Sequence, residues 1–169
     1  MKFLLAQINP VVGDLEGNAK KILYIASKAS SISADFVLTP ELSLWGYPAN
    51  DLLLKKNLIK NQYQILDQLA LDISKKCGNL SITIGIAEII NDSFFPNLYN
   101  SIALLEGGEW KIIARKIILP TYEVFDEKRY FRSEEKVSVL TKQINNKTWR
   151  IGFTTVSYTH LTLPTIRTV

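Results

Sequence analysis

Two segments of the chain carry apolar residues at the spacing of helices that bury one side. The first is expected to begin near Asn18, whose side chain can cap a helix, and its apolar positions are Ala19, Ile22, Leu23, Ala26 and Ala29. The second is expected over residues 57–77, before Gly78, which suits the residue that follows a helix. Its apolar face would hold Ile59, Tyr63, Leu66, Ala70, Ile73 and Cys77.

Short apolar runs around these helices predict strands. The first run should form a buried strand. Two pairs of later runs should form hairpins, whose turns are at Gly107-Gly108 and Asn145-Asn146. Residues 117–133 should be irregular. This order predicts a single layered α/β domain in which helices cover a mixed sheet. The predicted strands are 3–8, 36–38, 81–90, 99–105, 110–116, 137–140 and 148–153.

Composition and charge narrow the class of protein. With 169 residues, 47% of them hydrophobic, the chain can build a core and is not expected to contain long disordered regions. The net charge of +4 is spread out and interleaved with acids such as Asp126-Glu127, which is typical of a solvated surface rather than of a nucleic-acid binder. No stretch has membrane-spanning length. The one cysteine, Cys77, excludes an internal disulfide and fits a reducing, cytoplasmic setting as a core residue.

The candidate chemistry lies at the ends of two predicted strands. No phosphate-binding loop and no metal-ligand cluster appear, and the only histidine is His160. Glu41 follows the second strand and Lys116 closes the fifth, positions where α/β sheets bind ligands. A carboxylate base and an ammonium that stabilises an oxyanion can hydrolyse amides if a nucleophile is added. Taken alone, this pair would be better explained as a salt bridge or as two surface charges.

Two longer motifs favour the catalytic interpretation. Residues 39–48, followed by Asp51-Leu52-Leu53, resemble the glutamate motif of the nitrilase superfamily, and residues 115–131 resemble its lysine motif. The form of the second motif, which continues through residues 124–131, resembles the glutaminase domain of glutamine-dependent NAD+ synthetases. The opening residues 6–14 resemble the same branch. The resemblance spans residues 1–155.

This resemblance implies a fold and a site. The fold would be part of a four-layer αββα sandwich. Glu41 would be the base and Lys116 the oxyanion stabiliser of a Glu-Lys-Cys triad, and Tyr122, with Phe125, would line a glutamine pocket. For Tyr47 a packing role is the better interpretation.

The implied activity is hydrolysis of the glutamine side-chain amide. The ammonia would reach a C-terminal synthetase domain, absent from this chain, which amidates nicotinic acid adenine dinucleotide. No metal or cofactor is implied for the glutaminase part, whereas ATP and Mg²⁺ would belong to the synthetase domain. The full protein would be a cytoplasmic homo-oligomer with no nucleic-acid or membrane partner.

The third motif of the family is interrupted. Residues 149–155 resemble its lead-in, but Val156 stands where the cysteine is expected. Residues 156–169 hold no acidic residue and resemble nothing in the family, so we interpret them as a non-native tail that follows domain residues 1–155. A Ser157–His160 catalytic pair within this tail is the weaker interpretation. We therefore expect this chain to lack amidase activity, and its incomplete sandwich to be poorly soluble or molten.

Two other functions remain open from the sequence. One is a free-standing amidase or carbamoylase of the same superfamily, in which Glu41 and Lys116 would keep their roles. The other, if Val156 is genuine, is a non-catalytic nitrilase-like binding module.

Overall fold

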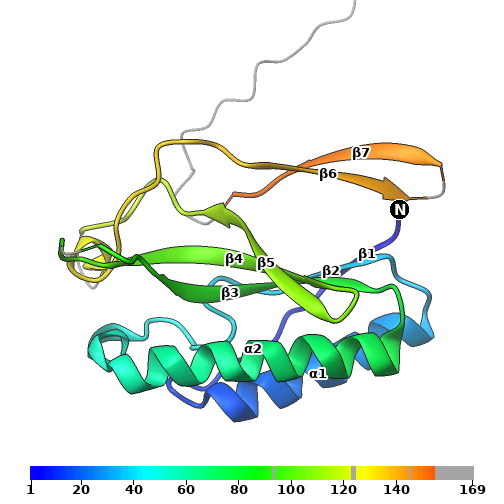
Figure 1. Cartoon of the computed structure of the whole chain (residues 1–169), viewed down its shortest axis with the longest axis horizontal. Coiled ribbons are helices and arrows are strands. Elements are labelled where there is room, and N and C mark those ends of the chain that lie inside the picture. The colour runs from blue at the N-terminus through cyan, green and yellow to red at the C-terminus, as the bar shows by residue number, and fades with distance from the viewer. Residues whose placement is uncertain (93, 123–124, 145, 155–169) are drawn as a thin grey trace, which may run out of the picture.

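The computed structural model describes residues 1–92, 94–122, 125–144 and 146–154, and its centre is a five-stranded mixed sheet (Figure 1). The strands lie in chain order, β1 to β5. The first three run parallel and the next two pairings are antiparallel. The predicted mixed sheet is therefore confirmed. Its strands are β1 (Phe3–Leu5), β2 (Phe36–Leu38), β3 (Ser81–Ile89), β4 (Leu98–Glu106) and β5 (Glu109–Arg115).

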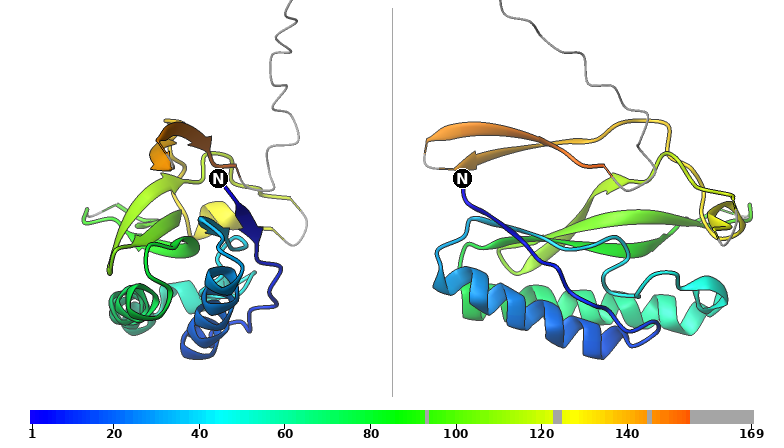
Figure 2. Two further views of the ribbon diagram at one scale, coloured as in Figure 1. Left: turned by 90° about the vertical axis from the view of Figure 1, so that its right-hand side faces the viewer. Right: turned by 180° about the vertical axis from the view of Figure 1, so that it is seen from behind.

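Two long helices, α1 (Leu15–Ser31) and α2 (Lys56–Cys77), lie side by side and cover one face of the sheet (Figures 1 and 2). The helix predicted over 57–77 is confirmed to within one residue. Its predicted apolar face is buried, except for the half-buried Tyr63. Gly78 ends the helix with φ 63°, and Cys77 is a buried core residue, as expected.

The prediction that Asn18 caps the first helix is wrong. The cap is Asp14, whose carboxylate accepts a hydrogen bond from the Gly17 amide, and the helix begins at Leu15. Asn18 lies one turn inside the helix and is fully buried. Its side chain bonds both main-chain groups of Val11 and the Leu44 carbonyl. It therefore joins the N-terminal loop to the loop that follows β2.

A hairpin of β6 (Val139–Ile144) and β7 (Lys147–Gly152) lies over the opposite face of the sheet (Figures 1 and 2). The sequence predicted this pair, but its first strand begins two residues and ends four residues later than predicted. The hairpin at Gly107-Gly108 is also confirmed, and both glycines have positive φ. The described residues supply one helix layer, one five-stranded sheet and a separate two-stranded sheet, so the chain forms part of an αββα sandwich.

Strand β1 differs from the prediction of a buried strand. It has three residues, and Phe3 and Leu5 are 45% and 69% exposed. The reason is its position, because within the described residues β1 pairs with β2 alone and forms an edge of the sheet. In the part of the chain that the structure describes, neither long helix is apolar enough to cross a lipid bilayer.

Candidate active site

The position of Glu41 is fixed by close packing of two backbone segments, the turn after β2 and strand β3. Glu41 follows β2, and the next residue, Leu42, has φ 45°. A Cβ atom at Gly85, on β3, would lie 2.2 Å from the Leu42 nitrogen, so only glycine permits this approach. The Gly85 amide also donates to Ser43 Oγ at 3.0 Å, and its carbonyl accepts from the Leu44 amide. The turn after β2 is therefore fixed against β3.

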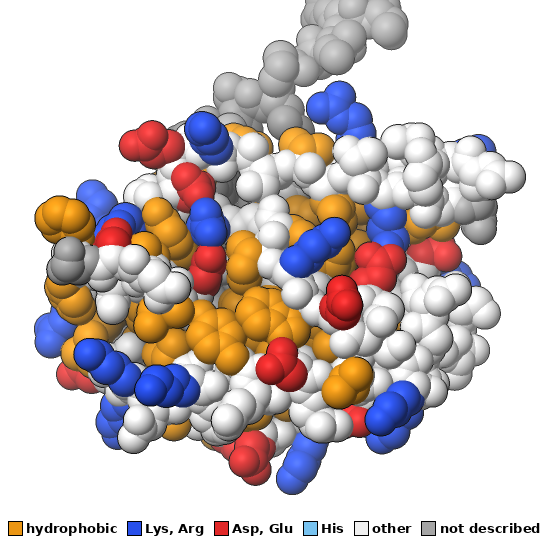
Figure 3. All heavy atoms as spheres, viewed as in Figure 1, with side chains coloured by type: hydrophobic (Ala, Val, Ile, Leu, Met, Phe, Trp, Pro, Cys, Tyr) orange, Lys and Arg blue, Asp and Glu red, His pale blue; other side chains and the backbone are white. Residues whose placement is uncertain are grey.

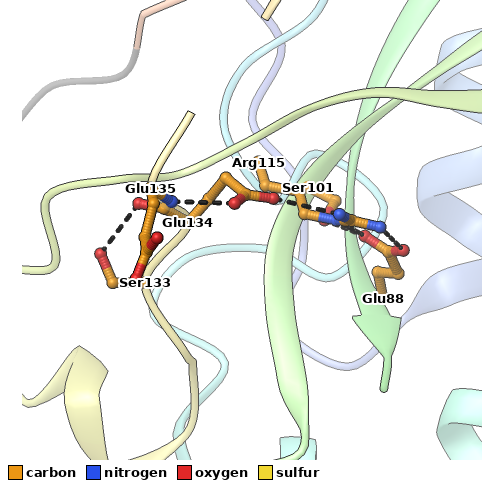
Figure 4. A network of polar contacts seen from close by, with 6 residues as sticks. All are labelled: Glu88, Ser101, Arg115, Ser133, Glu134 and Glu135. Carbon is orange, nitrogen blue, oxygen red and sulfur yellow. Dashed lines mark hydrogen bonds and ion pairs between the residues drawn. The ribbon is translucent and has the colours of Figure 1, made fainter. Parts of the chain in front are cut away.

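Lys116 is held by its own main chain at the end of β5. Its amide donates to the Asn100 carbonyl on β4 at 2.8 Å, and its carbonyl accepts from the Glu134 amide at 3.1 Å. The preceding residue, Arg115, anchors the strand end through a polar network (Figure 4). Its guanidinium donates twice to Glu88, at 2.6 and 2.7 Å, and once to Glu134 at 3.1 Å. The Glu88 hydrogen bond is the main reason that the pKa of Arg115 is raised.

The structure brings Glu41 and Lys116 together, as the sequence predicted. Lys116 Nζ donates to Glu41 Oε1 at 2.7 Å and to Glu127 Oε1 at 2.8 Å. Asn100 Nδ2 also donates to Glu41 Oε1, at 2.6 Å. The lysine side chain is 2% exposed and that of Glu41 13%. The ammonium thus lies between two carboxylates, largely out of water, where its electrostatic effect on a nearby atom is strong.

Glu127 is buried, whereas the sequence predicted that it lies on a solvated surface. The residue is 5% exposed, and besides Lys116 it accepts a hydrogen bond from Tyr47 Oη at 2.8 Å. Desolvation raises the pKa of the Glu127 carboxyl, even though Lys116 and Tyr47 act in the opposite direction. Its Oε2 is buried without a hydrogen-bond partner among the described residues. Glu127 lies in a short 3-10 helix of residues 127–129, within a segment without apolar periodicity, so no pattern signalled its burial.

Tyr47 does more than pack. Its ring lies 6.1 Å from that of Phe125 while its hydroxyl holds Glu127. Burial, together with the neighbouring carboxylate of Glu127, raises the pKa of this phenol. Tyr47 therefore remains a neutral hydrogen-bond donor to Glu127 across the physiological pH range.

A cavity of about 340 Å³ lies beside the Glu41–Lys116 pair. This volume is in the range of small-molecule sites. Its wall also includes Gly152, Phe153 and Thr154, the residues that lead toward the interrupted third motif. Val156, Ser157, His160 and the boundary at residue 155 lie outside the described residues. The remaining lining residues are Leu38, Thr39, Pro40, Thr83, Gly85, Asn100, Ser101, Ile102, Ala114 and Arg115.

The wall of this cavity does not include Tyr122 or Phe125. Tyr122 is 62% exposed and its ring meets that of Phe125 edge-on at 5.6 Å. Phe125 lines a much smaller hollow together with Tyr47 and Glu127. Contact of either aromatic residue with glutamine stays a prediction.

Comparisons with known proteins agree with this arrangement. The profile of the family described as carbon-nitrogen hydrolase matches residues 5–161. A glutamine-dependent NAD+ synthetase of Thermotoga maritima is 36% identical over 140 residues, which are 83% of this chain and 23% of that protein. One from Synechocystis sp. is 40% identical over 132 residues, 78% of this chain and 24% of the relative. The chain thus spans about a quarter of the length of these relatives.

Solved structures show the same fold. The glutamine-dependent NAD+ synthetase of Acinetobacter baumannii, solved with ADP, superposes with a TM-score of 0.74 at 33% identity, over 88% of this chain and 26% of that one. An amidase from Nesterenkonia sp. AN1, in which acrylamide has added to the active-site cysteine, superposes with a TM-score of 0.68. It is 19% identical, and the match covers 89% of this chain and 56% of the amidase. At this identity the likeness concerns the fold alone.

Proposed function

Because the chain belongs to the carbon-nitrogen hydrolase family, we propose that it is the N-terminal part of a glutaminase domain whose parent enzyme supplies ammonia for NAD+ synthesis. The observation that carries the proposal is the contact between Lys116 Nζ and Glu41 Oε1 in the wall of the cavity. The relatives that match more than three quarters of the chain are glutamine-dependent NAD+ synthetases. They favour this function over a free-standing amidase or carbamoylase.

The geometry suits the first step of amide hydrolysis. In a complete domain, Glu41 would accept the proton of a cysteine thiol placed beyond residue 154. The thiolate would attack the side-chain carbonyl carbon of glutamine, and Lys116 would donate a hydrogen bond to the oxygen that gains negative charge. The C–N bond would then break as the nitrogen receives the proton from Glu41 and leaves as ammonia. A thioester to the enzyme would remain.

The second step would use the same residues. Glu41, again ionised, would accept a proton from a water molecule that attacks the thioester carbonyl carbon. The C–S bond would break as the sulfur receives the proton from Glu41, which releases glutamate and restores the enzyme's thiol. Lys116 would stabilise the oxyanion in both steps. Neither step uses a metal or an organic cofactor.

Partners and setting follow from the proposed parent enzyme. Glutamine would be the substrate of this domain, and a synthetase domain with ATP and Mg²⁺ would consume the ammonia. The parent would assemble as a homo-oligomer in the cytoplasm, a compartment that suits a chain whose single cysteine cannot form an internal disulfide.

The proposal is tested by sequencing the source DNA from codon 150 onward and assaying the encoded protein for ammonia release. A cysteine codon at position 156 and a long reading frame with a synthetase half would support it. A short frame that completes only the hydrolase domain would favour a free-standing amidase. If Val156 is confirmed, the chain should bind glutamine without releasing ammonia, and a binding module would be the better account.

A further inference from the structure

Asn100, a residue of β4, contacts both members of the candidate pair. Its side-chain amide donates to Glu41 Oε1 at 2.6 Å, and its main-chain carbonyl accepts from the Lys116 amide at 2.8 Å. It is 4% exposed and lines the 340 Å³ cavity with both of them. The pairing of Ala87 with Asn100 places it in a continuous ladder between β3 and β4, so its backbone is fixed. One rigid residue therefore holds two groups that are 75 positions apart in sequence.

The contact leaves the two carboxylate oxygens of Glu41 in different states. Oε1 accepts from both Asn100 Nδ2 and Lys116 Nζ. Only the NH₂ side of the asparagine amide can face a carboxylate, which fixes the amide orientation. Oε2 has no hydrogen-bond partner among the described residues and is not one of their fully buried, unpaired atoms. The Glu41 side chain is 13% exposed and lines the cavity. Oε2 is thus the oxygen available to a group in the cavity.

We propose that Asn100 is a positioning residue that fixes Glu41 Oε1 and thereby presents Oε2 as the proton-accepting oxygen. This inference rests on the proposed function and names the atom that performs its first step. Without the amide donor, the carboxylate can turn about its last side-chain bond and leave Lys116. A misplacement of about 1 Å in such a site can cost about 10²-fold in rate.

The test uses the full chain and a signal from Lys116 itself. NMR of the lysine ammonium groups measures how fast the Lys116 Nζ protons exchange with solvent, with Lys116→Met providing the assignment. In Asn100→Ala we expect this exchange to become about tenfold faster, which is the order of magnitude of losing a hydrogen bond to a charged group. In a crystal structure of this variant, Glu41 Oε1 should have moved away from Nζ. An exchange rate within twofold of the parent, or an unmoved carboxylate, would overturn the proposal.

Gln62→Ala is the matched control. Gln62 is a fully buried amide on α2 that donates to the Ala87 carbonyl at 2.7 Å, and it does not line the cavity. This variant should leave the Lys116 exchange rate unchanged even if its melting temperature falls as much. If Asn100→Ala does not fold, Asn100→Leu replaces it, because leucine keeps the side-chain volume but lacks the amide donor. The same increase in the exchange rate of the Lys116 Nζ protons is expected.

The readout also separates this inference from the proposed function. It involves no ammonia release, so it would stand if the parent protein acted on another amide. If instead the exchange rate does not change while Glu41 still proves essential for hydrolysis, only the role of Asn100 is lost.

Discussion

The ammonium group of Lys116 lies 2.7 Å from Oε1 of Glu41, a residue that precedes it by 75 positions. The lysine side chain is 2% exposed, and a second carboxylate, that of Glu127, lies 2.8 Å from the same nitrogen. Two carboxylates therefore depend on one buried cation. This arrangement has consequences for stability as well as for chemistry.

Replacing Lys116 by an uncharged residue should strongly destabilise the fold. In Lys116→Met, Glu41 and Glu127 would lose their shared partner in a poorly solvated site. Breaking a buried ion pair by removing one partner typically costs about 3–5 kcal/mol, so we expect a loss of this size in the free energy of unfolding. Chemical denaturation measures it.

The control for this variant is Arg129→Gln. Arg129 pairs with Asp51 at 3.5 Å on the surface, where both side chains are more than half exposed. Removing such a pair should change the free energy of unfolding by at most about 1 kcal/mol. Equal losses in the two variants would contradict the buried character of the Lys116 site.

Gly85→Ala should disturb the position of Glu41. The added Cβ would lie 2.2 Å from the Leu42 nitrogen, a backbone atom that cannot rotate away. Overpacking of this kind costs about 1–3 kcal/mol, and here the turn that carries Glu41 must move. Gly152→Ala is the control, because a Cβ there meets nothing within 4 Å. Thermal unfolding of both variants checks the prediction, which fails if they melt at the same temperature.

The raised pKa of Glu127 predicts a pH dependence. Because burial disfavours the ionised carboxylate, the folded pKa exceeds the unfolded value, so stability is greatest below the unfolded pKa and declines as pH rises through the folded one. Glu127→Gln removes this titration. The variant should resemble the parent near pH 4 and become the more stable of the two toward neutral pH. The melting temperatures of the parent and of the variant, measured across this pH range, test the prediction. If they differ by the same amount at every pH, desolvation of the ionised Glu127 does not cause the difference.

Exposed apolar side chains should make the chain associate. The edge strand β1 exposes Phe3 and Leu5. Figure 3 shows further hydrophobic groups at the level of the sheet, on the face that looks away from β1. Edge strands of this kind pair with other chains. Leu5→Lys should raise the soluble, monomeric fraction while changing the unfolding free energy by no more than about 0.5 kcal/mol. Light scattering of the two chains tests this, and equal association would exclude the edge as its cause.

The sequence predicted which helices and strands form better than it predicted where they end and how deeply they are buried. The α2 face follows helical spacing closely, because all of its predicted apolar residues except the half-buried Tyr63 are buried in the core. The start of α1 was misplaced because Asp14 and Asn18 are both good caps, and only the tertiary contacts of Asn18 decide between them. Exposure of β1 depends on its place at the sheet edge, which no local pattern encodes.

The sequence also predicted some residues of the candidate site and not others. Glu41 and Lys116 were predictable because each follows a strand and stands in a long motif. Asn100 and Glu127 were not, since a polar residue within a strand has no pattern of its own, and Glu127, although it stands in the lysine motif, does not follow a strand. Their roles arise from hydrogen bonds that only the folded chain forms.

The most direct test of the central claim is ammonia release by a chimera. Residues 1–155 of this chain would be joined to the remainder of the Thermotoga maritima synthetase, which should supply the nucleophile and the rest of the domain. NAD+ formation from added ammonium would show that the synthetase half is folded. We predict that the chimera releases ammonia from glutamine and that Glu41→Gln lowers the rate by about 10²–10⁴-fold, the usual contribution of a general base. A Glu41→Gln chimera that hydrolyses glutamine at the full rate would contradict the account.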